Sequence, residues 1–126
     1  MNLTINKCNN NNTLLYSTKV GTWHSHSRVG RLELSKKLIE EENAYIMGEF
    51  EVDRGHRNGA EVHRVYSNGV IEIFNRDSKR FVTLLIGTPN QVKRYFTLTR
   101  TPITEEVEGA MRLARIHKRL KYNEVN

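Results

Sequence analysis

The sequence has a single cysteine, two prolines and no long apolar run, and these shortages exclude whole classes of protein. Cys8 has no second cysteine with which to pair, so a small secreted domain held by disulfides is excluded. No stretch approaches the roughly 20 apolar residues that a membrane-spanning helix needs. The first residues also lack a basic segment followed by an apolar one, so we expect no secretory signal. Together these absences predict a cytoplasmic protein with no membrane partner.

What is present fits one small and rather polar domain. Of the 126 residues, 27% are charged and 37% are hydrophobic, which suits a single core. The 20 Lys and Arg residues outnumber the 14 Asp and Glu residues, so the formal net charge is +6. That excess favours an anionic partner, with nucleic acid first. A basic protein that merely stays soluble is the alternative, and charge alone does not separate the two.

Three short β-type runs form the centre of the chain, within residues 54–96. Asn68-Gly69 separates the first two runs and predicts a two-residue hairpin, because both central residues of a type I′ turn need positive φ. An earlier run of alternating apolar and acidic residues adds a fourth strand. The predicted strands cover residues 45–53, 60–66, 70–75 and 80–86.

Helical patterns flank these strands. Thr88-Pro89 and Thr101-Pro102 each place an N-cap threonine before a proline, which predicts the start of a helix. The expected fold class is α+β: a four-stranded antiparallel β-meander with an N-terminal helix and a C-terminal helix packed on one face. The predicted single domain, residues 1–126, consists of an irregular segment at 1–26, a helix at 27–44, the sheet at 45–86 and a helical part at 87–126.

Strand alternation predicts which side chains share a face of the sheet. A two-residue turn at Asn68-Gly69 pairs Tyr66 with Ile71, and a four-residue loop then pairs Phe74 with Phe81. The face expected to form the core carries Val62, Tyr66, Ile71, Ile73, Val82 and Leu84. The face expected to be wetter carries Glu49, Glu51, Glu61, His63, Val65, Glu72, Phe74, Phe81 and Thr83.

The wetter face holds groups that could do chemistry. His63 near Glu61 and Glu72 can act as a general acid or base at neutral pH, and the Thr83 hydroxyl can position a phosphate. These are parts of a metal-independent ribonuclease, in which one group takes the ribose 2′-hydroxyl proton and cations stabilise the phosphorane. A solvated sheet face carries the same residue types without any chemistry, and this alternative stays open. The cations expected to hold the nucleic-acid backbone are Arg54, His56, Arg57, Lys93 and Arg94.

Residues 54–96 resemble the toxin-like endoribonucleases of the barnase/EndoU/colicin/RelE type, the BECR fold. The resemblance rests on Gly55-His56, Asn58-Gly59-x-Glu61-x-His63, Asn68-Gly69-x-Ile71-x-Ile73-x-Asn75, Phe81-Val82-Thr83-x-Leu85-Ile86 and Pro89-x-Gln91-Val92-x-Arg94-Tyr95. It implies helices before a four-stranded antiparallel sheet and catalysis without a metal. By position, it implies His63 as the leading acid or base, assisted by Glu61. It implies Thr83 as a phosphate or hydroxyl contact, Arg94 as the electrophile and Tyr95 as a proton carrier.

The resulting hypothesis is a phage or mobile-element endoribonuclease that cleaves RNA by 2′-hydroxyl transesterification without a cofactor. The alternative is a non-catalytic anti-defence inhibitor that binds a host nucleoprotein or nucleic acid. RNA is the expected partner, and a cognate inhibitor or a host defence complex is the expected protein partner. No metal site is expected, since His24, His26, His56 and His63 do not follow any known ligand spacing.

The last predicted helix, about residues 102–122, is acidic at its start and basic at its end. This distribution is the one that the helix dipole favours, and an RNA-binding stripe is the alternative. The basic residues are Arg112, Arg115, Lys118, Arg119 and Lys121.

Overall fold

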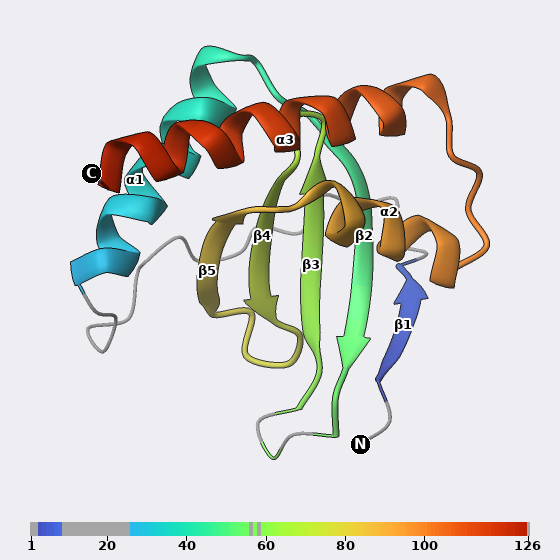
Figure 1. The fold of residues 1–126 in the computed structure, drawn as a ribbon. Helices are drawn as coiled ribbons and strands as arrows, with labels where there is room; N and C mark the ends of the chain where they lie inside the picture. Colours follow the sequence, from blue (N-terminus) through green and yellow to red (C-terminus); the bar gives the residue numbers. More distant parts are fainter. Residues whose placement is uncertain (1–2, 9–25, 56, 58, 126) are drawn as a thin grey trace.

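The computed structural model describes residues 3–8, 26–55, 57 and 59–125 of the chain. It has an α+β fold with a five-stranded antiparallel sheet in the order β1-β2-β3-β4-β5 (Figure 1). This confirms the predicted fold class. The elements are β1 (Thr4–Lys7), α1 (His26–Glu41), β2 (Ile46–Asp53), β3 (Glu61–Tyr66), β4 (Val70–Asn75), β5 (Phe81–Ile86), α2 (Pro89–Leu98) and α3 (Glu105–Val125).

The sheet has one strand more than predicted. β1 lies in the segment expected to be irregular and pairs antiparallel with β2, with Ile5 opposite Val52. The four predicted strands are present, with bounds that agree within one residue. Most of the segment predicted to be irregular, residues 9–25 with His24, lies outside the described residues.

Helices cover both faces of the sheet, whereas the sequence predicted them on one. α1 packs against β4 and β5 on one face, and α2 and α3 lie on the other (Figure 1). The reason is visible in β4, where residues 70–74 are all buried, since a strand covered on both faces does not alternate between buried and exposed positions. The core on the α1 face contains Leu32, Leu38, Val62, Val70, Phe74, Phe81, Leu84 and Ile86. The core on the other face contains Phe50, Val65, Ile71, Ile73, Val92, Phe96, Val107, Ala110 and Ala114.

The β3–β4 hairpin has a three-residue loop and not the predicted two-residue turn. Val65 pairs with Ile71, and the Gly69 N–H donates to the Tyr66 carbonyl at 2.9 Å. Gly69 has φ +87°, whereas Asn68 is not among the residues with positive φ, so the turn is not type I′. The pairing therefore differs by one residue from the predicted register, and such a shift moves side chains to the other face.

Five side chains predicted to share a face with His63 lie instead on the α1 face. In β2, Phe50 pairs with His63, so its neighbours Glu49 and Glu51 point the other way. In β4, Ile73 pairs with His63, so the neighbouring side chains also point away. The side chains that lie on the α1 face, and not on the predicted face, are Glu49, Glu51, Glu72, Phe74 and Phe81.

Phe74 and Phe81 are paired as predicted, but they are not exposed. Their rings make a T-shaped contact with centroids 5.7 Å apart, and they are 1% and 6% exposed in the core under α1. A bulge between Ile73 and Phe74 then shifts the register, so that Thr83 lies opposite Ile73.

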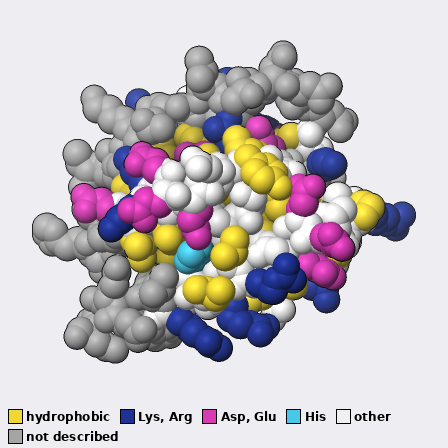
Figure 2. Space-filling model, turned by 90° about the horizontal axis from the view of Figure 1, so that it is seen from above, with side chains coloured by type: hydrophobic (Ala, Val, Ile, Leu, Met, Phe, Trp, Pro, Cys, Tyr) yellow, Lys and Arg dark blue, Asp and Glu magenta, His cyan; other side chains and the backbone are white. Residues whose placement is uncertain are grey.

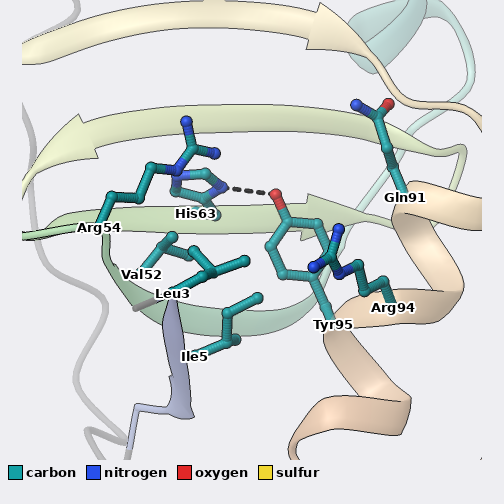
Figure 3. Close-up of a pocket in the computed structure, with 8 residues that line it drawn as sticks. All are labelled: Leu3, Ile5, Val52, Arg54, His63, Gln91, Arg94 and Tyr95. Carbon is teal, nitrogen blue, oxygen red and sulfur yellow. Dashed lines mark hydrogen bonds between the residues drawn. The ribbon is translucent and has the colours of Figure 1, made fainter. Parts of the chain in front are cut away.

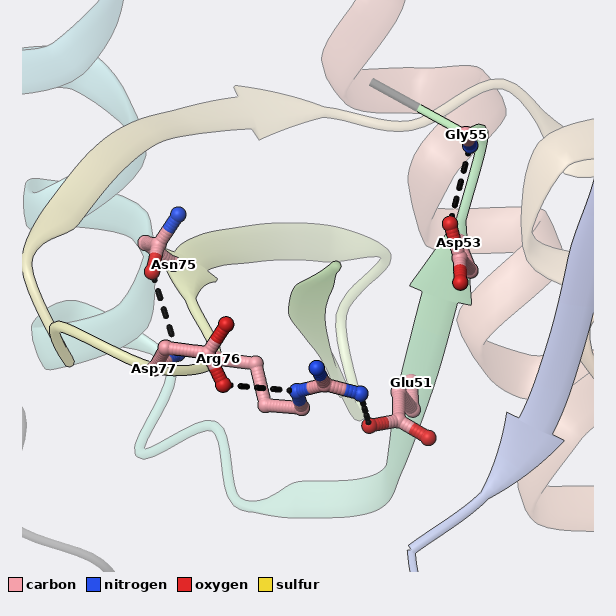
Figure 4. Close-up of polar contacts among 6 residues, drawn as sticks. All are labelled: Glu51, Asp53, Gly55, Asn75, Arg76 and Asp77. Atoms are coloured by element: carbon pink, nitrogen blue, oxygen red, sulfur yellow. Dashed lines mark hydrogen bonds and ion pairs between the residues drawn. The ribbon is translucent and has the colours of Figure 1, made fainter. Parts of the chain in front are cut away.

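Turn contacts anchor the end of the sheet that carries Arg54 (Figure 4). Arg76 of the β4–β5 turn donates to Glu51 of β2 at 2.7 Å and to Asp77 at 3.0 Å. The Asp53 carboxylate accepts the Gly55 N–H at 2.8 Å, which closes the turn just after β2. Arg54 lies inside that turn.

The predicted cap of α2 is confirmed. The Thr88 hydroxyl accepts the Gln91 N–H at 3.1 Å, and the Gln91 side-chain oxygen accepts the Thr88 N–H at 2.9 Å. The last helix begins at Glu105 and not near Pro102, because Thr104 provides the hydroxyl that accepts from the Val107 N–H. Among the described residues, none of these helices combines the length and the apolar character needed to span a bilayer.

Candidate active site

A small pocket lies where β1, β2 and β3 meet α2 (Figure 3). Its volume is about 110 Å³, well below the 300 Å³ or more of a typical site for a drug-sized ligand, so it suits a group no larger than a phosphodiester. One side is apolar and consists of Leu3, Ile5 and Val52. The polar side consists of Arg54, His63, Gln91, Arg94 and Tyr95.

Three side chains, those of Tyr95, His63 and Glu61, form a hydrogen-bonded chain that begins at this pocket and ends at Glu61 of β3. His63 is only 1% exposed, and both ring nitrogens have partners: Nδ1 lies 2.5 Å from the Tyr95 hydroxyl and Nε2 lies 3.0 Å from Glu61 Oε1. An ionised Glu61 can only accept, so the neutral imidazole carries its proton on Nε2. The Tyr95 hydroxyl therefore donates to Nδ1, and the chain is oriented from the pocket toward Glu61.

Aromatic packing fixes the position of Tyr95. Its ring centroid lies 5.2 Å from that of Phe50 and 5.6 Å from that of His63. Phe96, the next residue of α2, makes a T-shaped contact with the same Phe50 ring at 5.2 Å. Because Phe50 is fully buried, α2 is held on β2 through two consecutive aromatic residues.

The surroundings keep the Tyr95 hydroxyl protonated. Burial raises the pKa of Tyr95 to about 12; the Glu61 carboxylate also raises it, while the Arg54 and Arg94 guanidinium groups act in the opposite direction. At neutral pH the Tyr95 oxygen can therefore accept a proton only while it passes its own proton to His63. Tyr95 is partly exposed, whereas His63, which lines the same pocket, is buried.

Four of the six predicted catalytic residues converge here: Glu61, His63, Arg94 and Tyr95. Glu72 does not, because the register places it on the α1 face. There it accepts from the Tyr66 hydroxyl at 2.9 Å and lies 3.5 Å from Arg64.

Thr83 shares the face of His63 but not its pocket. Both residues pair with Ile73, from opposite sides, so Thr83 lies two strands away, or roughly 10 Å. Its hydroxyl makes a long contact, 3.4 Å, with the Leu84 carbonyl. The structure therefore gives Thr83 no contact with the pocket.

The predicted nucleic-acid contacts divide in a similar way. Arg54 and Arg94 line the pocket, whereas Arg57 and Lys93 are exposed outside it. His56 lies outside the described residues. Among the described residues, no group of three His, Cys, Asp or Glu side chains is placed to hold a metal ion.

Gln91 and the apolar wall were not predicted as site residues. Gln91 precedes Tyr95 by four positions, and residues at this spacing share a face of a helix, so the sequence did contain that signal. Leu3 and Ile5 alternate with polar neighbours, but a pattern this short is not sufficient to predict a strand.

The arrangement is chemically similar to the relay of a hydroxyl, an imidazole and a carboxylate that activates nucleophiles in hydrolases. Here the hydroxyl is a tyrosine, and two guanidinium groups share its pocket. The resemblance of residues 54–96 to BECR nucleases stays a prediction. Comparison with protein-family models, curated proteins and solved structures found no match for this chain.

Proposed function

We propose that this protein is a metal-independent endoribonuclease of the BECR type that acts on RNA in the cytoplasm. The observation that carries the proposal is the hydrogen-bonded chain Tyr95–His63–Glu61, which opens into a pocket lined by Arg54 and Arg94. Acid–base groups and cations at one small pocket are what phosphodiester cleavage requires.

The reaction begins at the ribose 2′-hydroxyl next to the scissile phosphate. Its proton moves to the Tyr95 oxygen while the Tyr95 proton moves to His63 Nδ1, and the 2′-oxygen forms a bond to phosphorus. The bond from phosphorus to the 5′-oxygen then breaks, and the 5′-oxygen takes a proton from solvent. The products are a 2′,3′-cyclic phosphate and a 5′-hydroxyl end.

Each remaining group has a role that follows from its charge. Glu61 stabilises the imidazolium that forms when His63 accepts the proton. Arg54 and Arg94 stabilise the negative charge that grows on the phosphorane oxygens. Relay catalysis of this kind contributes about 10²- to 10⁴-fold in rate.

Cleavage of total RNA in the presence of EDTA tests the proposal. The wild-type protein should cut RNA and leave cyclic phosphate ends, whereas Tyr95→Phe should be inactive with an unchanged fold. Tyr45→Phe is the matched control, because Tyr45 is exposed, hydrogen-bonds to Glu106 and does not line the pocket. If purified wild-type protein leaves a broad RNA panel intact, the proposal is wrong. The non-catalytic inhibitor then becomes the better hypothesis, and it predicts a stable complex that His63→Ala does not change.

A further inference from the structure

A second and larger cavity lies on the other side of the start of α2. This groove has a volume of about 570 Å³ and separates the first turn of α2 from the C-terminal half of α3. It is lined by Thr88, Pro89, Asn90, Arg115, Lys118 and Arg119. Three of these residues are cations and none is acidic.

The cations in this groove meet another positive charge. The groove contains the N-terminus of α2, where the helix dipole is positive and the first turn has no acidic residue. Arg115 and Arg119 are four residues apart, so they extend from one face of α3. Neither of them makes an ion pair within the described part of the chain. The dipole of α3 does not account for these two arginines, because its effect is confined to the last turn and the last turn of α3 has no basic residue.

Three of the four acidic residues of α3 lie at its opposite end, and the fourth, Glu124, is five positions after Arg119. Glu105, Glu106 and Glu108 are in the first turn, at least seven positions before Arg115. Figure 2, which looks down onto α3, shows Lys and Arg side chains gathered along the lower edge of the view, with acidic groups to the left and right. This separation leaves a positive surface that an anion can occupy.

The groove and the active-site pocket share a wall. Asn90 lines the groove, and the next residue of α2, Gln91, lines the pocket together with Arg94. The two cavities are therefore separated by about one helix diameter, roughly 10 Å. An extended strand with a phosphate in the pocket can cross the first turn of α2 and place another phosphate in the groove.

We propose that this groove binds the backbone phosphates of single-stranded RNA next to the scissile bond. This inference rests on the proposed function and extends it, since the groove would hold RNA without taking part in the chemistry. It also assigns a role to the basic end of α3. The partner is identified by its chemistry, which is a flexible polyanion with regularly spaced phosphates.

Binding measured without cleavage tests the groove. In the Tyr95→Phe protein, a triple change of Arg115, Lys118 and Arg119 to alanine removes three positive charges from the groove. The dissociation constant for a fluorescein-labelled 12-nucleotide RNA should rise at least tenfold by fluorescence anisotropy. The slope of log affinity against log salt concentration should become less steep by about 2, since each of the three lost phosphate contacts contributes about 0.7 to it.

A matched triple variant controls for net charge. Lys36, Lys37 and Arg80 are exposed and lie away from both cavities, and their change to alanine removes the same charge. Equal weakening by the two triple variants, or equal binding of a polyglutamate of the same length, would overturn the groove proposal. Thermal unfolding of both variants checks that they are folded.

Cleavage assays distinguish a failure of the groove proposal from a failure of the proposed nuclease function. With Tyr95 intact, the groove variant should cut a dinucleotide such as UpA as fast as wild type and cut the 12-mer more slowly. Equal rates on both substrates would contradict the groove. Absence of cleavage by the wild-type protein would contradict the nuclease, and the binding comparison would still decide whether the groove holds RNA.

Discussion

Neighbouring residues of β3 belong to two polar clusters on opposite faces of the sheet. His63 extends toward Tyr95 and the pocket of about 110 Å³. Arg64 extends to the α1 face, where it lies 3.7 Å from Glu49 and 3.5 Å from Glu72. Both clusters combine carboxylates with a tyrosine, but His63 and Tyr95 line a cavity, whereas Arg64, Glu49 and Glu72 line neither of the two cavities described above.

The two clusters contain similar residue types, so residue type alone does not identify a functional site. The Arg64 side chain is 8% exposed. Its guanidinium lies between two carboxylates and over the Phe74 ring, at 5.1 Å from the ring centroid. Its charge is therefore balanced by two carboxylates at a largely buried position. Arg54 and Arg94 instead line a cavity and make no ion pair within the described residues, so their charge is available to a ligand. We therefore expect chemistry on one face and stability from the other.

The largest expected effect is on cleavage by His63→Ala. The rate should fall about 10²- to 10⁴-fold, because Tyr95 loses the acceptor for its proton. Ile73→Val, which changes the residue paired with His63, is the control. It should cost about 0.5–1.5 kcal/mol of stability and leave the cleavage rate per folded molecule unchanged. Equal loss of activity in both variants would show that the site depends on packing alone.

Arg64→Ala should have the opposite effect, a large loss of stability with an unchanged rate of cleavage. Removing one member of a buried charge cluster leaves the carboxylates of Glu49 and Glu72 without compensation, which costs about 3–5 kcal/mol. Urea unfolding measures the loss, and RNA cleavage by the fraction that stays folded should match wild type. If the Arg64→Ala protein is stable but no longer cuts RNA, the catalytic groups lie on the α1 face and not at the pocket.

Alkaline pH tests the tyrosine of each cluster. The pKa of Tyr95 is raised from 10 to about 12, so the folded state holds this proton more tightly than the unfolded state. Stability from Tyr95 is fully present below about pH 10 and is lost as pH rises through 12, at up to about 1.4 kcal/mol per pH unit. Burial and Glu72 raise the pKa of Tyr66 as well, so Tyr66 adds a loss of the same sign.

Single substitutions separate these two contributions. Tyr95→Phe and Tyr66→Phe should each flatten the fall in unfolding free energy between pH 10 and 12, whereas only Tyr95→Phe should abolish cleavage. A Tyr95→Phe curve that runs parallel to wild type would show that this hydroxyl does not titrate as its surroundings indicate.

The smallest effect is expected at the exposed cluster around Arg76 (Figure 4). Its ion pairs with Glu51 and Asp77 are solvated, since the Arg76 side chain is 46% exposed. Arg76→Ala should lower the melting temperature slightly at low salt and not at 1 M salt, because the ions screen such pairs. A large decrease in melting temperature that persists at 1 M salt would mean that this turn does more than anchor β2.

The sequence predicted the four strands β2 to β5 and the cap of α2 because their signals are local. Asn68-Gly69 marked the hairpin, and Thr88-Pro89 marked the start of the helix. The register was wrong because the choice between two and three loop residues depends on tertiary contacts. The Asn68 side chain donates to Glu42 at 2.9 Å, and a Cβ on Gly69 would lie 2.6 Å from that of Ala114.

The candidate site was predictable in part for the same reason. Glu61 and His63 are two residues apart on one strand, so alternation alone put them on one face. Tyr95 reaches His63 from 32 residues away, and only the family resemblance suggested that contact. Glu72 was assigned to the site through the wrong register.

One measurement tests the central claim most directly. Two oligonucleotides of the same sequence are incubated with the protein in EDTA, one all-ribose and the other with a 2′-deoxyribose at the nucleotide that is cut. The account predicts that the all-ribose strand is cleaved to a 2′,3′-cyclic phosphate and that the substituted strand stays intact at that position. Cleavage of both strands, or of neither, would contradict the proposal that the Tyr95–His63–Glu61 chain takes its proton from a ribose 2′-hydroxyl.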